Sequence, residues 1–174
     1  MTAAPERLPL SVRLATSDDM EIIWSLVTQL AEFEALLAAV RGDAPALGEL
    51  LFGPDARAQA LIAALGSEAV GMAIFFTSIS TFLGRPGIYV EDLFVLPHQR
   101  SRGVGTALMQ ALAGLCEERG AARLEWSVLN SNRTAIGFYQ GLGASPLEDW
   151  TTYRMEGESL SRLAAAAARR RAVD

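Results

Sequence analysis

Residues 87–106, GIYVEDLFVLPHQRSRGVGT, contain the pattern that decides the fold of this chain. Residues 87–95 are nearly continuous in apolar and aromatic side chains, as in a buried strand, and only Glu91 and Asp92 interrupt them. From Gly103 to Arg119, apolar side chains recur at three- and four-residue spacing, and Gly120 follows as a helix stop. The sequence therefore predicts a buried strand, a short loop and a long amphipathic helix in direct succession.

The loop between that strand and helix, residues 100–106, has the composition of an anion-binding turn. Backbone N–H groups at a helix N-terminus attract phosphate, and glycines let the phosphate approach the backbone closely. The dinucleotide pattern G-x-G-x-x-G is not met, because Leu108 stands where a third glycine is required. Two glycines at this spacing also fit an ordinary junction between a loop and a helix.

Glu91 and Asp92 are two charges in a strand that we expect to be central. Unpaired buried charges cost several kcal/mol, so proteins keep them mainly where they are paired, solvated by a cleft or used in chemistry. Adjacent strand residues point to opposite faces, so only one of the two can face a given ligand. Glu91 either takes part in chemistry or pairs with Arg154 or another arginine across the sheet.

The flanking sequence predicts a mixed α/β fold in a single domain. Upstream, the patterns indicate a strand at 11–15, a helix from a Thr16/Asp19 capping box to about residue 33, a short helix at 47–52, and a hairpin of strands 60–65 and 69–79. A second turn is expected at 84–87. Downstream, we expect a strand at 124–128, a short helix at 133–141 and a last strand at 150–155. The domain spans residues 10–160, and 161–174 form an alanine- and arginine-rich tail with a short amphipathic helix.

Composition excludes several kinds of chemistry. The chain has 174 residues, a net charge of −5 and no lysine, which disfavours nucleic-acid binding and removes Walker-type phosphate binding and Schiff-base catalysis. One cysteine and one histidine cannot form a structural zinc site or an internal disulfide, so we expect no metal. Cys116 is expected in the core and His98 in a solvated loop.

Hydropathy predicts a cytoplasmic protein without a membrane partner. No stretch approaches about 18 uninterrupted apolar residues, and residues 1–10 lack a basic segment followed by an apolar one.

The order of these features resembles the GNAT superfamily of acyl-CoA-dependent N-acetyltransferases, and within it the diamine (spermidine/spermine) acetyltransferase branch. The resemblance runs from about Val12 to Leu160. It rests on six segments: AEFE at 31–34, YVEDLFV at 89–95, the loop at Arg100, Asn132 with Phe138-Tyr139, GAS at 143–145, and Trp150 with YRM at 153–155. It implies a GNAT fold, with a central, mixed but mostly antiparallel sheet that is flanked by helices and splays beside strand 87–95, where acyl-CoA enters.

The resemblance implies acetyl-CoA as cosubstrate and assigns residues to it. The loop is expected to hold the pyrophosphate, and the strand and the later helix are expected to line the pantetheine arm. These cofactor-binding residues are Leu93, Phe94, Val95, Arg100, Ser101, Arg102, Gly103, Val104, Gly105, Thr106, Asn132, Thr134 and Ala135.

The resemblance also implies a general acid, Tyr139, which would protonate the departing thiolate. A phenol with a pKa of about 10 is protonated at neutral pH, and a thiolate whose conjugate acid has a pKa of about 8.5 accepts a proton of similar strength. The alternative is that Tyr139 is only a packed helix aromatic beside Phe138.

The acceptor implied by the resemblance is a primary amine of a small cationic metabolite. An alkylammonium with a pKa of about 10.4 must lose a proton before it attacks, and Glu91 is the expected base and substrate contact. Glu34 and Glu148 match positions that the diamine branch uses, and Trp150 offers a ring face to a cation.

Three acceptors stay open at this point: a diamine, a polyamine, and a lysine-like amino acid such as thialysine. Polyamine-acting relatives carry an acidic residue before Gly87, where this chain has Ser80 and Thr81, and residues 35–55 lack their acidic density. Two functions outside this class also stay open: acetylation of a protein or peptide, and a non-catalytic acyl-CoA-binding module. The resemblance further implies a homodimer to which the C-terminal segments contribute.

Overall fold

The computed structural model describes residues 8–171. The first residues of the N-terminal stretch and the last three residues of the tail lie outside the described part of the chain. The chain divides into two compact units, Met1–Ser127 and Val128–Asp174, which are described one after the other. The domain boundaries at 10–160 stay a prediction.

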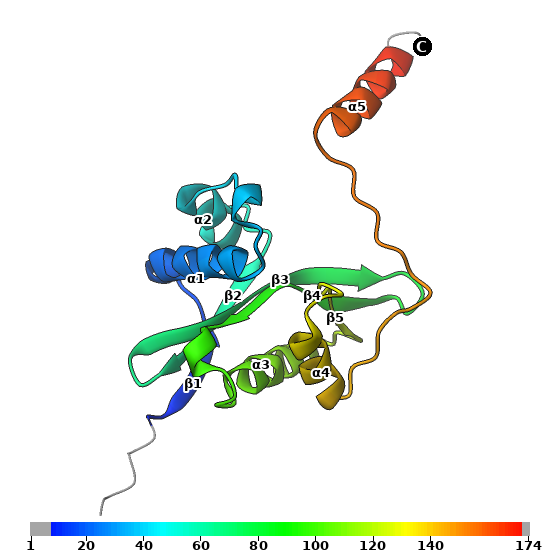
Figure 1. Cartoon of the computed structure of the whole chain (residues 1–174). Coiled ribbons are helices and arrows are strands. Elements are labelled where there is room, and N and C mark those ends of the chain that lie inside the picture. Colours follow the sequence, from blue (N-terminus) through cyan, green and yellow to red (C-terminus); the bar gives the residue numbers. More distant parts are fainter. Residues whose placement is uncertain (1–7, 172–174) are drawn as a thin grey trace, which may run out of the picture. The chain divides into compact units, whose positions relative to one another are not determined.

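The first unit is built on a five-stranded sheet with the order β1-β2-β3-β4-β5 (Figure 1). Its strands are β1 (Leu10–Leu14), β2 (Gln59–Leu65), β3 (Glu68–Ser80), β4 (Arg85–Val95) and β5 (Leu124–Trp126). Strands β1 to β4 pair antiparallel, and β5 pairs parallel to β4. The predicted mixed, mostly antiparallel sheet is confirmed.

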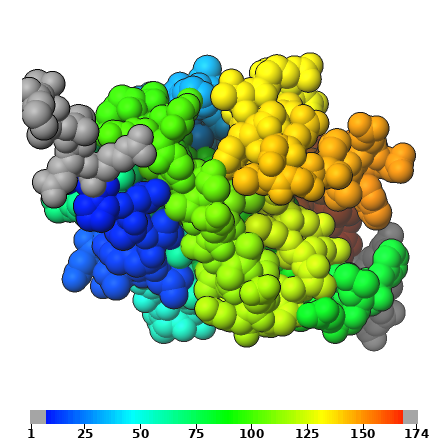
Figure 2. All heavy atoms as spheres, turned by 90° about the horizontal axis from the view of Figure 1, so that it is seen from below, coloured from blue at the N-terminus to red at the C-terminus, as the bar shows by residue number. Residues whose placement is uncertain are grey.

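Two helical layers cover the sheet, one on each face (Figure 1). Helices α1 (Met20–Phe33) and α2 (Ala44–Phe52) lie on one face, and α3 (Val104–Glu118) lies on the other. Under α1 and α2 the core comprises Ile23, Leu26, Leu51, Ala60, Ile62, Met72, Ile74 and Phe94. Helix α3 buries Val104, Leu108, Met109 and Leu112, and its outer surface faces the viewer in Figure 2.

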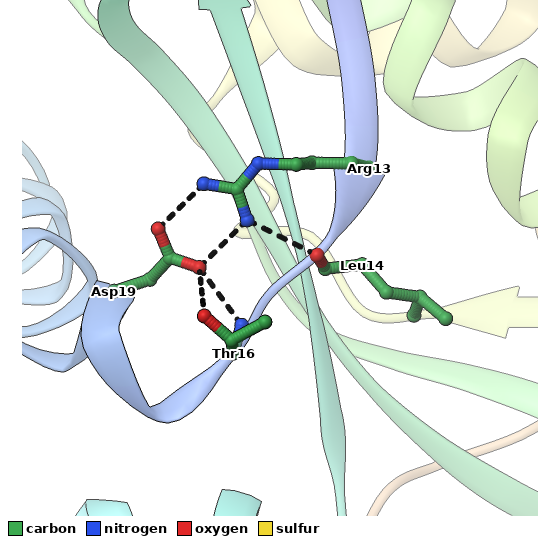
Figure 3. Close-up of polar contacts among 4 residues, drawn as sticks. All are labelled: Arg13, Leu14, Thr16 and Asp19. Atoms are coloured by element: carbon green, nitrogen blue, oxygen red, sulfur yellow. Dashed lines mark hydrogen bonds and ion pairs between the residues drawn. The ribbon is translucent and has the colours of Figure 1, made fainter.

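The predicted start of α1 is confirmed, and it includes an ion pair that the sequence pattern did not indicate (Figure 3). The Thr16 backbone N–H donates to Asp19 Oδ2 at 2.8 Å, while both Nη atoms of Arg13 in β1 donate to the same carboxylate at 2.7 Å. Asp19 is 5% exposed, and these donors lower its pKa to about 2, the Arg13 hydrogen bonds first. The pair joins β1 to the 3-10 turn Ser17–Asp19 that precedes α1.

The β2–β3 hairpin agrees with the prediction, but the turn expected at 84–87 was wrong. Ser80 pairs with Arg85 and Ile79 with Pro86, so residues 81–84 form the turn and Arg85 and Pro86 belong to β4. A proline lacks a backbone N–H, but this is tolerated at the start of a strand. Pro86 was therefore interpreted as part of a turn, although it lies at the start of β4.

Short helices complete the described chain. Two more 3-10 turns, Leu37–Ala39 and Pro97–Gln99, lie in the first unit. Helix α2 begins three residues before the predicted start, because the Asp43 side chain accepts from the Ala46 N–H and Pro45 occupies the first turn. In the second unit, α4 (Arg133–Gly141) is capped by Asn132, and α5 (Gly157–Arg171) includes the tail helix that we expected.

The strand predicted at 150–155 is absent from the second unit. Residues 144–156 have no regular secondary structure in the described chain, and the side chains of Trp150, Tyr153 and Met155 are exposed. A strand needs a partner for its backbone hydrogen bonds, and residues 150–155 pair with no strand in their unit. The predicted strand at 124–128 is likewise shorter and ends at Trp126.

Candidate active site

The sheet opens along one edge of β4, as the resemblance implied. Strand β5 pairs with Ile88, Tyr89 and Val90 only, so beyond Val90 the sheet pairing of β4 is with β3 alone. The Leu96 N–H donates to the Val70 carbonyl in β3, and the backbone groups of its neighbour Val95 therefore point away from β3. An extended ligand can hydrogen-bond to such an edge as an added strand does.

A β-bulge lies where the sheet opens. Ile74 in β3 pairs with Asp92 and Phe75 pairs with Val90, so Glu91 is the extra residue of β4. A bulge breaks the strict alternation of side chains and re-aims those beside it. Val90 therefore shares a face with Phe75, whereas Asp92 shares a face with Phe94 in the core beneath α1.

The two carboxylates, both expected in a buried strand, have different environments at the bulge. Glu91 is exposed, so the expectation of a buried Glu91 was wrong, and Asp92 is half-buried in its place. Burial first, and then the nearby charges of Glu91 and Glu34, raise the pKa of Asp92 to about 6. The alternative pairing of Glu91 with Arg154, a residue of the second unit, stays a prediction.

Glu34 joins this group from the end of α1. It is the half-buried C-cap residue of the helix, and its charge acts on Asp92. The next residues close the helix in a Schellman turn, in which the Ala35 N–H bonds to the Glu32 carbonyl and the Leu36 N–H to the Ala31 carbonyl. Glu34, Glu91 and Asp92 thus form a carboxylate cluster suited to a cation.

The predicted anion loop leads into an uncapped helix N-terminus. Gly103 precedes α3 with a φ of +87°, and no side chain caps the helix. The first-turn N–H groups of an α-helix have no partner within the helix, so they can bind an anion. The helix start lies close to the sheet because Gly71 has no side chain: a Cβ there would lie 3.3 Å from Cγ1 of Val104, the first residue of α3.

The two arginines of the loop point to different surroundings. Arg102 is exposed and donates to the buried Gln99 side chain at 2.5 Å, which holds it beside the loop. Arg100 is half-buried, its Nε donates to the Val95 carbonyl at 3.1 Å, and its guanidinium carbon lies 4.1 Å from the centre of the Phe33 ring. Burial lowers the pKa of Arg100.

The remaining predicted residues belong to the second unit. They are described within that unit alone. The Asn132 side chain accepts from the Ala135 N–H at 3.1 Å and caps α4, with Thr134 exposed on the first turn. Tyr139 is half-buried, and its ring centre lies 5.2 Å from that of Phe138. Glu148 and Trp150 are exposed in the segment that follows.

Sequence reasoning missed two residues. Asp92 was seen but passed over, because strict strand alternation was assumed and a single sequence carries no clear sign of a bulge. Phe33 was expected only as the approximate end of a helix, yet 49% of it is exposed and its ring lies against Arg100. The only sequence feature that could have indicated the contact between Phe33 and Arg100 was an aromatic residue next to an acidic one, Phe33-Glu34, at the end of a helix.

The other reactive side chains contribute no second site. Cys116, expected in the core, is half-buried, and burial raises the pKa of its thiol; His98 is exposed. Among residues 8–171 there is no group of three histidine, cysteine or acidic residues placed to hold a metal ion. No helix in the described part of the chain has the length and apolar character needed to cross a membrane.

The chain is similar to known acetyltransferases in sequence. It is 34% identical over 152 residues to a thialysine N-epsilon-acetyltransferase of Caenorhabditis elegans, covering 86% of this chain and 93% of that protein. A mouse thialysine N-epsilon-acetyltransferase is 32% identical, covering 88% and 96%. An L-ornithine N5-acetyltransferase of Arabidopsis thaliana is 34% identical, but over only 53% of this chain and 41% of that protein.

Solved structures share the fold. An integron cassette protein from the mobile metagenome of V. cholerae superposes with a TM-score of 0.73 at 24% identity, covering 89% of this chain and 97% of that one. An aminoglycoside acetyltransferase from a soil metagenomic sample gives a TM-score of 0.71 at 23% identity, covering 86% and 99%. Residues 27–144, well over half of the chain, match the acetyltransferase (GNAT) family. The chain therefore belongs to the GNAT family and is an N-acetyltransferase.

Proposed function

We propose that this enzyme transfers the acetyl group of acetyl-CoA to a primary amine of a small cationic metabolite. The observation that carries the proposal is the cluster of Glu34, Glu91 and Asp92 beside the unpaired edge of β4. Such a cluster attracts an ammonium group to the strand edge. The names of the relatives, which acetylate thialysine and ornithine, support a lysine-like or ornithine-like amine as the acceptor.

The acyl donor is proposed to bind along β4 and the loop after it. Within Leu93 to Val95, the backbone groups of Leu93 and Val95 flank Phe94 and point to the edge without a neighbouring strand, where they offer hydrogen bonds to the pantetheine amides; the Val95 carbonyl also accepts from Arg100. The pyrophosphate lies on the N–H groups of residues 101–106, where the dipole of α3 and the charge of Arg102 favour an anion. Asn132, Thr134 and Ala135 are proposed to flank the same pantetheine arm.

Asp92 is proposed as the base that takes the proton from the ammonium group, directly or through a water molecule. A base works best when its pKa lies close to the working pH, and a pKa of about 6 meets this condition better than the ordinary value of 3.8. Glu91 and Glu34 attract the cation and hold the pKa of Asp92 high. Glu91 therefore keeps its predicted contact with the substrate but gives up the role of base.

Tyr139 is proposed to protonate the thiolate of coenzyme A as it leaves, so that the amide product and the free thiol depart as neutral groups. Its position on α4, half-buried beside Phe138, gives the phenol a fixed and partly apolar setting. The phenol and the carboxylate then exchange protons with the solvent before the next cycle. Glu148 and Trp150 are proposed to contact the distal part of the amine.

A homodimer is proposed because the C-terminal segment leaves large apolar side chains uncovered. Exposed residues between 147 and 163 include Leu147, Trp150, Tyr153, Met155, Leu160 and Leu163. Such a cluster is typical of an interaction surface. A cytoplasmic location stays a prediction.

The proposal is tested by measuring thiol release from acetyl-CoA with thialysine, lysine, ornithine, putrescine and spermidine, each at several concentrations. Mass spectrometry then identifies the acetylated nitrogen. We expect saturable acetylation of at least one amine, which Glu34→Gln weakens through a higher KM. Activity on none of them, with acetyl-CoA still bound in calorimetry, would refute the proposed acceptor class. A silent wild type that also fails to bind acetyl-CoA would contradict the proposed donor site.

A further inference from the structure

Arg100 belongs to the predicted anion loop, but the surroundings of its side chain are not those expected of a side chain that binds phosphate. Its backbone N–H bonds to the Pro97 carbonyl and its Nε to the Val95 carbonyl. Its guanidinium stands over the Phe33 ring at 4.1 Å and lies 5.8 Å from the centre of the Phe94 ring. Most of its contacts therefore face the interior of the first unit.

We propose that Arg100 is a positioning residue, which fastens the end of α1, and with it Glu34, to the end of β4 and so shapes the amine side of the site. This inference rests on the proposed function, because it assigns the amine to the carboxylate cluster. It replaces the sequence-based expectation that the Arg100 side chain binds a phosphate of coenzyme A.

The end of α1 is closed by its Schellman turn, and Leu30 packs on the core, whereas the last residue, Phe33, is held by ring contacts. Phe33 is the last residue of the helix and is 49% exposed, while its ring lies 6.5 Å from that of Phe94 at 53° between the planes. A partly desolvated arginine over an aromatic face contributes more than an exposed one. The guanidinium thus covers the ring of the last helical residue, next to Glu34, and adds to the Schellman turn and the core packing.

The other end of the arginine is fixed on the strand. Val95 is 8% exposed, and its carbonyl lies on the unpaired edge of β4, where Nε donates to it. One planar group therefore touches the amine-side helix and the donor-side strand together. A lysine has no planar group to stack on Phe33 and no Nε–H along its stem to donate to Val95 at the same time, so it is a poor substitute here.

Two acyl donors separate positioning from phosphate binding. Acetyl-CoA carries the phosphates, whereas S-acetylpantetheine carries only the arm. Arg100→Lys is expected to lower kcat/KM for the amine about tenfold with both donors, and to change the affinity for CoA by less than about threefold. Arg102→Gln is the matched control, and it is expected to lower kcat/KM with acetyl-CoA but not with S-acetylpantetheine.

A second readout does not depend on activity. Hydrogen exchange of the amides of Ala35 and Leu36, which close α1, should quicken in Arg100→Lys and in Phe33→Leu, and should be unchanged in Arg102→Gln. The two substitutions should also be less than additive when combined, because they remove the same contact. This measurement remains informative if no amine proves to be a substrate.

Two results would overturn the inference. The first is an Arg100→Lys defect that disappears with S-acetylpantetheine, as the Arg102→Gln defect should. The second is unchanged exchange at the end of α1. A wild type inactive on every amine would refute the proposed function instead, and the exchange result would still decide whether Arg100 holds the helix end.

Discussion

Asp92 carries a charge that its surroundings disfavour. Burial and two neighbouring carboxylates, Glu91 and Glu34, act in the same direction and raise its pKa to about 6. A structural carboxylate gains nothing from such a position, since the ionised form is destabilised at neutral pH. A carboxylate that must bind a cation and accept a proton does gain, because the arriving ammonium group relieves the repulsion.

Asp92→Asn should abolish a pH dependence that the wild type shows. In the wild type, kcat/KM for the amine should rise as pH increases through about 6, because the base must be ionised, and this step should vanish in the variant with a loss of about a hundredfold. Steady-state rates between pH 5 and 8 measure it. In Glu91→Gln the step should persist and move to lower pH, since one like charge is gone. A step that vanishes in Glu91→Gln and persists in Asp92→Asn would restore Glu91 as the base.

The stability of Asp92→Asn gives an independent check that the pKa of Asp92 is raised in the folded state. A carboxyl group whose pKa is raised in the folded state destabilises that state as pH rises above the unfolded value of 3.8 and through about 6. The variant should therefore equal the wild type near pH 4 and be more stable by about 1 to 2 kcal/mol at pH 8. Chemical denaturation at the two pH values would show this.

Tyr139→Phe should reduce turnover and spare donor binding. Loss of a general acid lowers kcat by about a hundredfold or more, whereas the ring that packs on Phe138 is kept. Thiol release gives kcat, and calorimetry gives the affinity for acetyl-CoA. Unchanged turnover would make Tyr139 a packing residue, and lost donor binding would place it in the cofactor site.

The start of α1 shows which contacts a local sequence pattern can predict and which it cannot. Thr16 and Asp19 announced the start correctly, because a capping box is a contact between residues three apart. Arg13 was not foreseen, since its contact with Asp19 crosses from a strand to a helix start. The same limit applies to the bulge at Glu91, which depends on the register of β3, and to the strand predicted at 150–155, which depends on a partner.

Asp19→Asn should destabilise the protein in a pH-dependent way. The folded-state pKa of about 2 is below the ordinary 3.8, so the pair with Arg13 contributes about 2 kcal/mol above pH 4, and this contribution is lost as pH falls towards 2. Urea denaturation at pH 7 and pH 2.5 measures the change. Asp18→Asn is the control, because Asp18 is exposed. Equal destabilisation at both pH values would rule out the ion pair as the cause.

Ala35→Gly should stabilise the end of α1. Ala35 has a φ of +57°, a left-handed conformation that costs an L-residue about 1 kcal/mol and costs glycine almost nothing. Part of the gain is lost because glycine has a more flexible unfolded chain, so we expect a net increase of about 0.5 to 1 kcal/mol in the free energy of unfolding. Thermal unfolding measures it, and a lower stability would contradict the Schellman geometry.

For the molecule as a whole, the sequence predicted the sheet, its mixed pairing, its opening beside β4 and the family. The patterns alone, a continuous apolar run, a periodic helix and a glycine loop between them, predicted an α/β fold, and the resemblance to the family supplied the rest. The oligomeric state depends instead on whether exposed apolar side chains pack against a second copy of the chain, and no local sequence pattern predicts this contact. Tyr153, with 91% of its surface exposed, and Met155, with 53%, have no such cover in their unit.

The wild type is expected to sediment as a dimer at micromolar concentration. Tyr153→Asp combined with Met155→Asp should shift it to the monomer, because charges replace the apolar contact. Phe82→Asp, at an exposed aromatic in the β3–β4 turn, should leave the dimer intact. Analytical ultracentrifugation distinguishes the forms, and a wild-type monomer at every concentration would contradict the proposed dimer.

The central claim is that the acceptor is a small cationic amine, and a competition experiment tests it most directly. The enzyme receives isotopically labelled acetyl-CoA together with equal concentrations of thialysine and a peptide that offers a free N-terminus and a lysine. Mass spectrometry then counts the label in each product. The account predicts that nearly all label appears on thialysine, and that Asp92→Asn removes this preference together with the rate. Label mainly on the peptide would contradict the account.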